Sequence, residues 1–170
     1  PKIENFKGQI EEKGKNFPFE NRQILVSALE KQHEIFEISE STSQNIQLLK
    51  LSNTYTITTG HQLNLFTGPL YFLYKITSTI NLCKELRQKY PTQNFVPIYW
   101  MATEDHDFDE INYFNFKDQK FRWNRESKGP VGRLSTEGLD LVYEAFSKEI
   151  GLGNNAKYLL DLFKKSYLEH

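Results

Sequence analysis

The sequence lacks the features that would suit a membrane, a secretory pathway or a nucleic acid. It holds no apolar run of about 18 residues, the length that a membrane-spanning helix needs. Its opening stretch, PKIENFKGQIEEKGK, is too charged for a secretory signal peptide. Lysine and arginine number 21 against 22 aspartate and glutamate, so the net charge of −1 offers no broad basic field for a phosphate backbone. We therefore expect a cytoplasmic protein whose partners include neither a membrane nor a nucleic acid.

Cysteine is nearly absent, which excludes an internal disulfide. The single Cys83 fits a reducing compartment, and because it lies in a helical apolar pattern we interpret it as a core residue and not as a reactive thiol. A chain of 170 residues can bury one core, so one domain with an extension is the expectation. The first residue is Pro1 and not methionine, which suggests a piece of a longer protein.

The N-terminal third is predicted to be helical after an irregular start. Residues 1–18 are polar and lysine-rich with few periodic apolar positions, so we expect an irregular arm. Residues 19–36 show helical apolar spacing. The stretch SESTSQN, residues 39–45, reads as a break, followed by a short helix over 46–51.

A strand, a helix and a strand follow in order. TYTITT, residues 54–59, is β-branched and aromatic; residues 69–90 keep a 3.6-residue apolar period; and FVPIYWMA, residues 95–102, is apolar on both faces, as in a covered parallel sheet. Such a βαβ crossover is almost always right-handed, so both strands point the same way. The loops after the two strands should then emerge at one edge of the sheet, where α/β proteins bind ligands.

The remaining sequence predicts a hairpin and two helices. Residues 111–124 alternate apolar and polar about a turn at 117–120, and amphipathic helices are expected over 136–150 and 155–168. We therefore predict three parts: 1–52, an N-terminal arm with helices; 53–135, the first half of an α/β core with its hairpin; and 136–170, the truncated start of a helical insertion.

The first loop, GHQLNLFTG, has the composition of an anion-binding turn. A helix that begins beside Thr67 or Gly68 exposes unpaired N–H groups and the positive end of its dipole. Gly60 and Gly68 allow close backbone approach, and His61 and Gln62 can each donate a hydrogen bond. The spacing is neither that of a Walker loop nor GxGxxG. A phosphate-binding role and a simple tight turn both remain open.

The second loop, TEDHDFDE, gathers titratable side chains behind a buried strand. Such a cluster is costly unless a metal ion, an ammonium group or sugar hydroxyls bind there, or water separates the groups. Carboxylates and histidine suit several metals, but no metal-specific spacing appears. A solvated acidic turn is the simpler alternative. The titratable residues are Glu104, Asp105, His106, Asp107, Asp109 and Glu110.

Three stretches together resemble the BshC family of bacillithiol biosynthesis. They are TTGHQLNLFTGPLYFLYK, FVPIYWMATEDHDFDEIN and GPVGR, and the resemblance covers residues 53–133 well. It implies an α/β fold with a partial, N-terminal half of a Rossmann-like parallel sheet, a helical N-terminal extension and a helical insertion. It also implies a cysteine ligase that joins cysteine to glucosaminyl malate in the last step of bacillithiol biosynthesis. The family further implies a C-terminal coiled coil and a homodimer in the full-length protein, and we expect the fragment alone to be inactive.

The resemblance suggests roles for both loops. A nucleotide, ATP or ADP, is the expected activator of the carboxylate, and no metal is assigned. Many family members carry two glutamines where this chain has His61 and Gln62, which favours a shared hydrogen-bonding role over an indispensable proton donor. The expected catalytic residues are His106 as base with Asp105 and Glu104. The expected residues for binding substrate or nucleotide are Gly60, His61, Gln62, Thr67, Gly68 and Asp107.

Other interpretations remain open from the residues alone. One is a metal-dependent hydrolase or phosphoesterase that uses the acidic loop, and another is a nucleotide- or sugar-binding module without catalysis. Arg133 in GPVGR is a candidate anion clamp, although a lone loop arginine is usually solvated. Trp100 is a candidate apolar wall, with a core position as the simpler interpretation.

Overall fold

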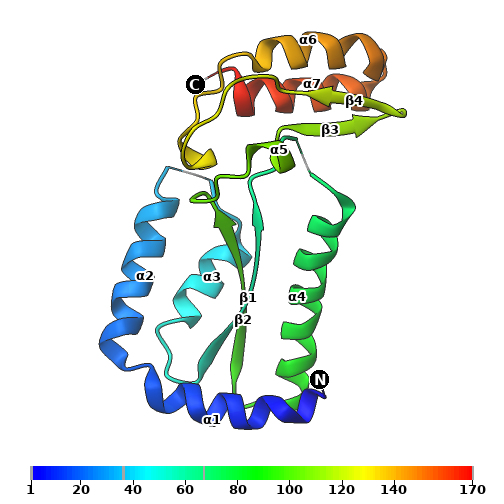
Figure 1. Ribbon diagram of the computed structural model, residues 1–170. Helices are drawn as coiled ribbons and strands as arrows, with labels where there is room; N and C mark the ends of the chain where they lie inside the picture. Colours follow the sequence, from blue (N-terminus) through cyan, green and yellow to red (C-terminus); the bar gives the residue numbers. More distant parts are fainter. Residues whose placement is uncertain (1, 36, 67, 170) are drawn as a thin grey trace. The chain divides into compact units, whose positions relative to one another are not determined.

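The chain folds into two compact units. The computed structural model in Figure 1 describes residues 2–35, 37–66 and 68–169. The first unit comprises Pro1–Thr59 and Lys75–Tyr99, and the second comprises Gly60–Tyr74 and Trp100–His170. These units cut across the boundaries expected at 52/53 and 135/136. The loops that carry the candidate site residues therefore fall in the same unit as the C-terminal helices.

In the first unit a two-stranded sheet is covered by helices on both faces. Strands β1 (Thr54–Gln62) and β2 (Asn94–Ala102) are hydrogen-bonded neighbours whose arrows point the same way, and α4 (Leu70–Lys89) connects them (Figure 1). Phe95 packs in a cluster with Cys83 and Leu86 of α4, whereas Val96 packs with residues of the N-terminal helices. Successive strand residues face opposite sides, so both faces of β2 are buried here. The predicted strand–helix–strand unit is confirmed.

The predicted irregular arm is wrong, because most of it is helical. A 3₁₀ turn at Ile3–Asn5 leads into α1 (Phe6–Asn16). Ile3, Phe6 and Ile10 are half-buried against the cluster that contains Leu86. Three apolar residues at helical spacing are a weak helix signal in the sequence. They stabilise the helix nevertheless, because they pack against a neighbouring apolar cluster.

Helices α2 (Phe19–His33) and α3 (Glu40–Leu48) complete the first unit. The start of α3 corrects the predicted break, since the Ser39 side chain accepts a hydrogen bond from the Thr42 backbone N–H at 3.2 Å and caps the helix. Residues that favour a break are the same ones that begin helices. Phe36, the predicted end of the preceding helix, lies outside the described residues.

Cys83 is a core residue, as predicted. It is 1% exposed, and burial raises the pKa of its thiol to about 11. At neutral pH the thiol is therefore protonated and a poor nucleophile.

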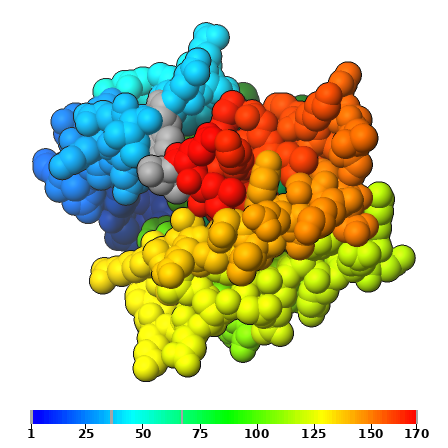
Figure 2. All heavy atoms as spheres, turned by 90° about the horizontal axis from the view of Figure 1, so that it is seen from above, coloured from blue at the N-terminus to red at the C-terminus, as the bar shows by residue number. Residues whose placement is uncertain are grey.

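The second unit packs a hairpin against two helices. Strands β3 (Tyr113–Phe116) and β4 (Gln119–Arg122) are antiparallel, with Lys117 and Asp118 at positive φ in the turn, the pattern of a type I′ hairpin. Helix α5 (Phe108–Ile111) precedes them, a 3₁₀ turn at Val131–Arg133 follows, and α6 (Leu139–Ile150) and α7 (Asn154–Tyr167) end the chain. Figure 2 shows α6 in orange beside α7 in red-orange.

An aromatic core joins the hairpin to the C-terminal helices. The Phe146 ring lies 5.0 Å from that of Phe114 and 5.5 Å from that of Phe121, and Phe163 belongs to the same cluster. No boundary follows residue 135, because this core needs residues from both sides of it. The architecture is α/β with a partial Rossmann-like sheet. Among the described helices, none is long and apolar enough to cross a membrane.

Candidate functional site

The first loop is anchored by two hydrophobic residues. Leu65 is buried, and its N–H donates to the Ile111 carbonyl at 2.9 Å. Phe66 has a φ of 65°, which is unusual for a large side chain, and its N–H donates to the Tyr167 hydroxyl at 3.0 Å. Burial raises the pKa of Tyr167. The Phe66 ring stacks on Phe114 at 5.0 Å, so packing against the aromatic core holds the loop in this conformation.

The polar residues of the first loop are held by Asn64. Its amide nitrogen donates to the Gln62 carbonyl at 3.1 Å and lies 2.9 Å from His61 Nδ1. With two N–H groups the amide can serve both acceptors. His61 Nδ1 also lies 3.3 Å from the Gln62 carbonyl oxygen, and the His61 ring packs edge-on against that of Phe72 at 5.6 Å.

Glycine is required at position 68 of this loop and allows close packing at position 60. Gly68 has a φ of 64°, and a Cβ there would lie 2.7 Å from Cβ of Asn64. At Gly60 a Cβ would lie 3.2 Å from the Trp100 carbonyl oxygen. Both glycines thus serve close packing within the protein, and Thr67 lies outside the described residues.

In the acidic loop, Asp105 and Asp107 are bound by backbone N–H groups. Asp105 Oδ1 accepts from the Asp107 N–H at 2.9 Å, and Asp107 Oδ1 accepts from the Glu110 N–H at 3.3 Å, where it caps α5. The Asp107 N–H and then the Gln62 amide hold the pKa of Asp105 below its ordinary value. Asp105 is therefore ionised at neutral pH, which makes it a charge and a hydrogen-bond acceptor.

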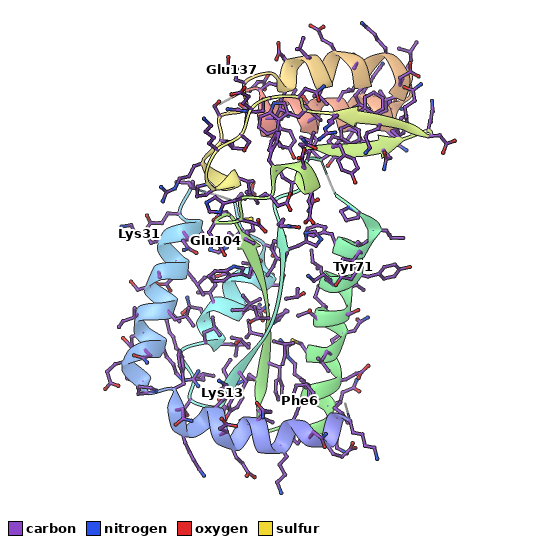
Figure 3. The ribbon with its side chains drawn as sticks, viewed as in Figure 1. Phe6, Lys13, Lys31, Tyr71, Glu104 and Glu137 are labelled. Carbon is purple, nitrogen blue, oxygen red and sulfur yellow. The ribbon has the colours of Figure 1, made fainter. Side chains whose placement is uncertain are left out.

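Glu104 and His106 lie at the surface of the same loop. Glu104, labelled in Figure 3, follows the end of β2 and accepts a long 3.4 Å hydrogen bond from the Trp100 indole N–H. Trp100 is 58% exposed, so the core position suggested for it is wrong. The His106 side chain is exposed, and its carbonyl accepts from the Phe108 N–H at 3.0 Å.

The third family stretch, GPVGR, lies against the acidic loop. The Val131 N–H donates to the Asp105 carbonyl at 2.7 Å, and the Gly132 N–H donates to the Thr103 carbonyl at 2.9 Å. A Cβ on Gly132 would lie 2.5 Å from Cβ of Thr103. The contact explains why a glycine stands there, while Arg133 is exposed at its edge.

The two predicted loops meet directly. The Gln62 side-chain amide donates to Glu110 Oε2 at 2.6 Å, and the Leu65–Ile111 backbone bond joins the same segments. The expectation that both loops emerge at one edge of the sheet is confirmed. Charge-assisted bonds of this kind are among the stronger ones in proteins.

A pocket of about 810 Å³ opens beside the Gln62–Glu110 pair. The two residues lie at its polar end, and aromatic rings of β3 and α6 line the rest. It includes the predicted residues His61, Gln62 and Gly68, but neither Gly60 nor the four residues Glu104–Asp107. The residues that line it are His61, Gln62, Asn64, Phe66, Gly68, Pro69, Tyr71, Glu110, Tyr113, Phe114, Asn115, Phe116, Phe146 and Leu159.

The charge of this pocket differs from the sequence-based expectation. Among the lining residues that the structure describes, Glu110 is the only carboxylate, and none is a lysine or an arginine. Such a pocket favours an ammonium group or a polar neutral group over a phosphate. Glu110 is thus a site residue that the sequence prediction left out. It stood in the acidic cluster, but only the turn of α5 carries it to Gln62.

The described residues offer no metal centre. Within residues 2–35, 37–66 and 68–169, no group of three or more histidine, cysteine, aspartate and glutamate side chains is placed to hold a metal ion. The metal-dependent hydrolase interpretation therefore finds no ligand set in this part of the chain.

Comparison with known proteins places the chain in a family. Residues 1–170 match the family described as "Bacillithiol biosynthesis BshC, N-terminal Rossmann-like domain". The chain is 66% identical over 170 residues to a Flavobacterium johnsoniae protein named "Putative cysteine ligase BshC", with all of this chain and 32% of that protein aligned. A Christiangramia forsetii protein of the same name is 59% identical over 100% of this chain and 32% of that protein. The Bacillus cereus protein of the same name is 41% identical over 85% of this chain and 29% of that protein. The chain spans about a third of the length of these relatives. The chain therefore belongs to the BshC family and corresponds to the N-terminal Rossmann-like domain of that family.

Proposed function

We propose that this domain binds the amine-bearing substrate of a cysteine ligase, which joins cysteine to glucosaminyl malate. Family membership supports the ligase class. The observation that carries the assignment of the pocket is the 2.6 Å bond between Gln62 and Glu110, which unites the two family loops at its rim. In the reaction a C–N bond forms between the cysteine carboxyl carbon and the sugar amine, which loses a proton. The bond from that carbon to one carboxyl oxygen breaks, and the oxygen leaves as part of the activating group.

The pocket suits an amino sugar in both charge and shape. Glu110 is an acceptor for an ammonium or amine N–H, and the Gln62 amide fixes the orientation of that carboxylate. Tyr113 and Phe116 line the pocket as aromatic surfaces, against which a cation or the apolar face of a sugar packs. The volume of about 810 Å³ lies within the usual range for small-molecule sites.

In this proposal the acidic loop supplies the proton chemistry. The amine attacks only in its neutral form, so a base must take its proton. We assign that role to His106, which lies outside the pocket lining but four residues before Glu110 on the same loop. Asp105, with its lowered pKa, is too weak a base for the task and instead stabilises positive charge on the amine or on His106. Glu104 and Asp107 add negative charge at the same loop.

We further propose that a nucleotide, ATP or ADP in class, takes part through the first loop. A free carboxylate is a poor electrophile, and transfer of a phosphoryl or nucleotidyl group from a bound nucleotide to one of its oxygens would make it a better one. Since the described residues that line the pocket include no lysine or arginine, the polar contacts to phosphate oxygens fall to His61 and to the first turn of α4. Homodimerisation and a cytoplasmic location belong to the same proposal, and light scattering of the full-length protein tests the first.

Amide formation by the full-length protein tests the assignment. We expect Glu110→Gln to lower kcat/KM about tenfold or more, because the variant removes the pocket's only carboxylate, and His106→Ala to lower kcat about 100-fold. Asp105→Ala and His61→Ala should each reduce turnover. Glu126→Gln, an exposed carboxylate outside the pocket, is the matched control. Unchanged product formation in Glu110→Gln would show that the pocket is wrongly assigned, and unchanged product formation in His106→Ala would show that the base is wrongly assigned.

A further inference from the structure

The first unit contains a separate pocket that the ligase proposal does not use. Its volume is about 320 Å³, and it lies between the end of α1, the start of α2 and the beginning of β1. All its lining residues belong to that unit. They are Lys13, Asn16, Phe17, Arg22, Leu25, Leu49, Thr54, Tyr55 and Thr56.

A buried arginine forms the floor of this pocket. Arg22 is 4% exposed. Its Nη1 donates to the carbonyls of Leu49 at 3.3 Å and Thr54 at 3.0 Å, and its Nη2 donates to the carbonyl of Ser52 at 3.2 Å. In the described residues, no carboxylate forms an ion pair with it. A buried charge is normally paired with an opposite charge, and here carbonyl dipoles and the face of the Phe17 ring offset it.

The rest of the lining adds positive charge and hydrogen-bond donors. Lys13, labelled on α1 in Figure 3, is a second cation on the lining. Asn16 contributes an amide, and Tyr55 and Thr56 contribute hydroxyl groups. The described residues of the lining include no aspartate or glutamate, so the two positive charges of Lys13 and Arg22 are not balanced among them.

Apolar walls complete the pocket. Phe17 lies beside Arg22, whose guanidinium carbon is 5.2 Å from the ring centroid, while Leu25 and Leu49 supply aliphatic surface. An inorganic ion would leave these walls uncovered. A ligand that fills the volume therefore has an apolar body as well as a charge.

We propose that this pocket binds a small organic oxyanion, a carboxylate or phosphate monoester on an apolar body. Guanidinium and ammonium groups are the usual partners of both oxyanions, and the ligand's charge would offset the cations of the lining. The site is distinct from the Glu110 pocket, whose lining holds one carboxylate and neither lysine nor arginine. The Glu110 pocket offers a carboxylate to an amine, whereas this pocket offers two cations to an oxyanion.

Calorimetry on the full-length protein tests this proposal. Phenyl phosphate and benzoate are the two oxyanion probes, and benzyl alcohol is the neutral probe of similar shape. We expect at least one oxyanion to bind with one site per chain and benzyl alcohol to bind at least about tenfold more weakly. Lys13→Glu should weaken oxyanion binding about tenfold or more. Lys15→Glu, which changes an exposed lysine on the same helix but not on the lining, should leave it unchanged.

Three results would overturn the proposal. The first is the absence of saturable binding by either oxyanion. The second is an equal weakening of oxyanion binding by Lys13→Glu and Lys15→Glu. The third is loss of oxyanion binding in Glu110→Gln, which would place the probe in the other pocket. Arg22 is not the first choice for substitution because of its structural bonds. The proposal is independent of the ligase assignment, since Glu110→Gln tests that assignment while Lys13→Glu leaves the Glu110 pocket unaltered.

Discussion

The two units of this domain differ in the apolar and charged side chains that they bury. The first unit has small clusters of mostly aliphatic residues on either face of its sheet, and it buries a cationic side chain. The second has one larger cluster dominated by aromatic rings, with its charged residues mainly at the surface. The polar residues of its site lie on loops whose anchors, Leu65 and Phe66, belong to or pack on that cluster.

The proposed site residues belong to the second unit, and the first unit has mainly a structural role in the ligase proposal. All three family stretches contribute residues to the second unit: the first loop, the acidic loop and GPVGR. Their positions depend on aromatic packing against α6 and α7, which the sequence suggested to be a separate insertion. We therefore expect changes in the aromatic core to disturb the site, and changes in the first unit to affect stability more than chemistry.

Removing the central ring of the aromatic cluster should have the largest effect. Phe146 is 1% exposed, and its ring centroid lies within 5.5 Å of those of four other phenylalanines. We expect Phe146→Ala to lower the free energy of unfolding by about 3–5 kcal/mol and to speed amide hydrogen exchange in residues 60–66, because Phe66 rests on this ring.

Phe95→Ala in the first unit is the counterpart. The Phe95 ring has more distant aromatic neighbours, Tyr55 at 6.1 Å and Tyr90 at 6.3 Å, so the exchange of residues 60–66 should not change in that variant. Hydrogen exchange followed by mass spectrometry on the full-length protein measures both. If Phe95→Ala exposed the first loop as much as Phe146→Ala, the two cores would not be separate.

The buried arginine gives the next largest difference between the units. Arg22→Met leaves the carbonyls of Leu49, Ser52 and Thr54 without their donors, so the free energy of unfolding should fall by about 2–4 kcal/mol. Arg125 of the second unit also donates to a carbonyl, that of Ser135 at 2.6 Å, but it is only half-buried. Arg125→Met should therefore cost less, about 1 kcal/mol. Urea denaturation compares the two, and equal losses would mean that burial of Arg22 contributes nothing.

Local patterns were sufficient to predict much of this architecture. The strand–helix–strand unit, the hairpin and both C-terminal helices follow from apolar periodicity, which depends only on nearby residues. The meeting of the two loops also followed, because parallel strands must end at one edge of the sheet.

What the sequence could not supply depends on distant contacts. Helix α1 forms because a cluster around Leu86 covers Ile3, Phe6 and Ile10, and no local pattern shows that cluster. The role of Glu110 depends on one helical turn that carries its side chain to Gln62. The grouping of residues 60–74 with 100–170 likewise reflects the nonlocal packing of Phe66 on Phe146 and Phe163.

A smaller effect is expected where GPVGR meets the acidic loop. Gly132→Ala would bring a methyl group to 2.5 Å from Cβ of Thr103, so the two segments must separate at a cost of about 1–3 kcal/mol. Gly153→Ala is the control, because a Cβ there meets nothing within 4 Å. Thermal unfolding of the full-length protein should show a loss for Gly132→Ala alone. Equal melting temperatures for the two variants would contradict the contact.

The smallest expected effect is the pH dependence that Asp105 contributes. The Asp107 N–H and the Gln62 amide lower the pKa of Asp105 in the folded protein, so its carboxylate stabilises the fold when it is ionised. This contribution is present at pH 7, and it disappears as the pH falls below about 4, the ordinary pKa of an aspartate, through the lowered value.

The variant Asp105→Asn should therefore be less stable than the parent at pH 7, and the difference in free energy of unfolding should shrink as the pH approaches 3. Gln62→Leu removes one of the two main causes of the shift, so it should move the pH range of this loss upward. Urea denaturation at a series of pH values measures both changes. A parent–variant difference that stays constant from pH 7 to pH 3 would show that the acidic loop does not use the Asp105 charge, and that its hydrogen bonds act equally well with a neutral side chain.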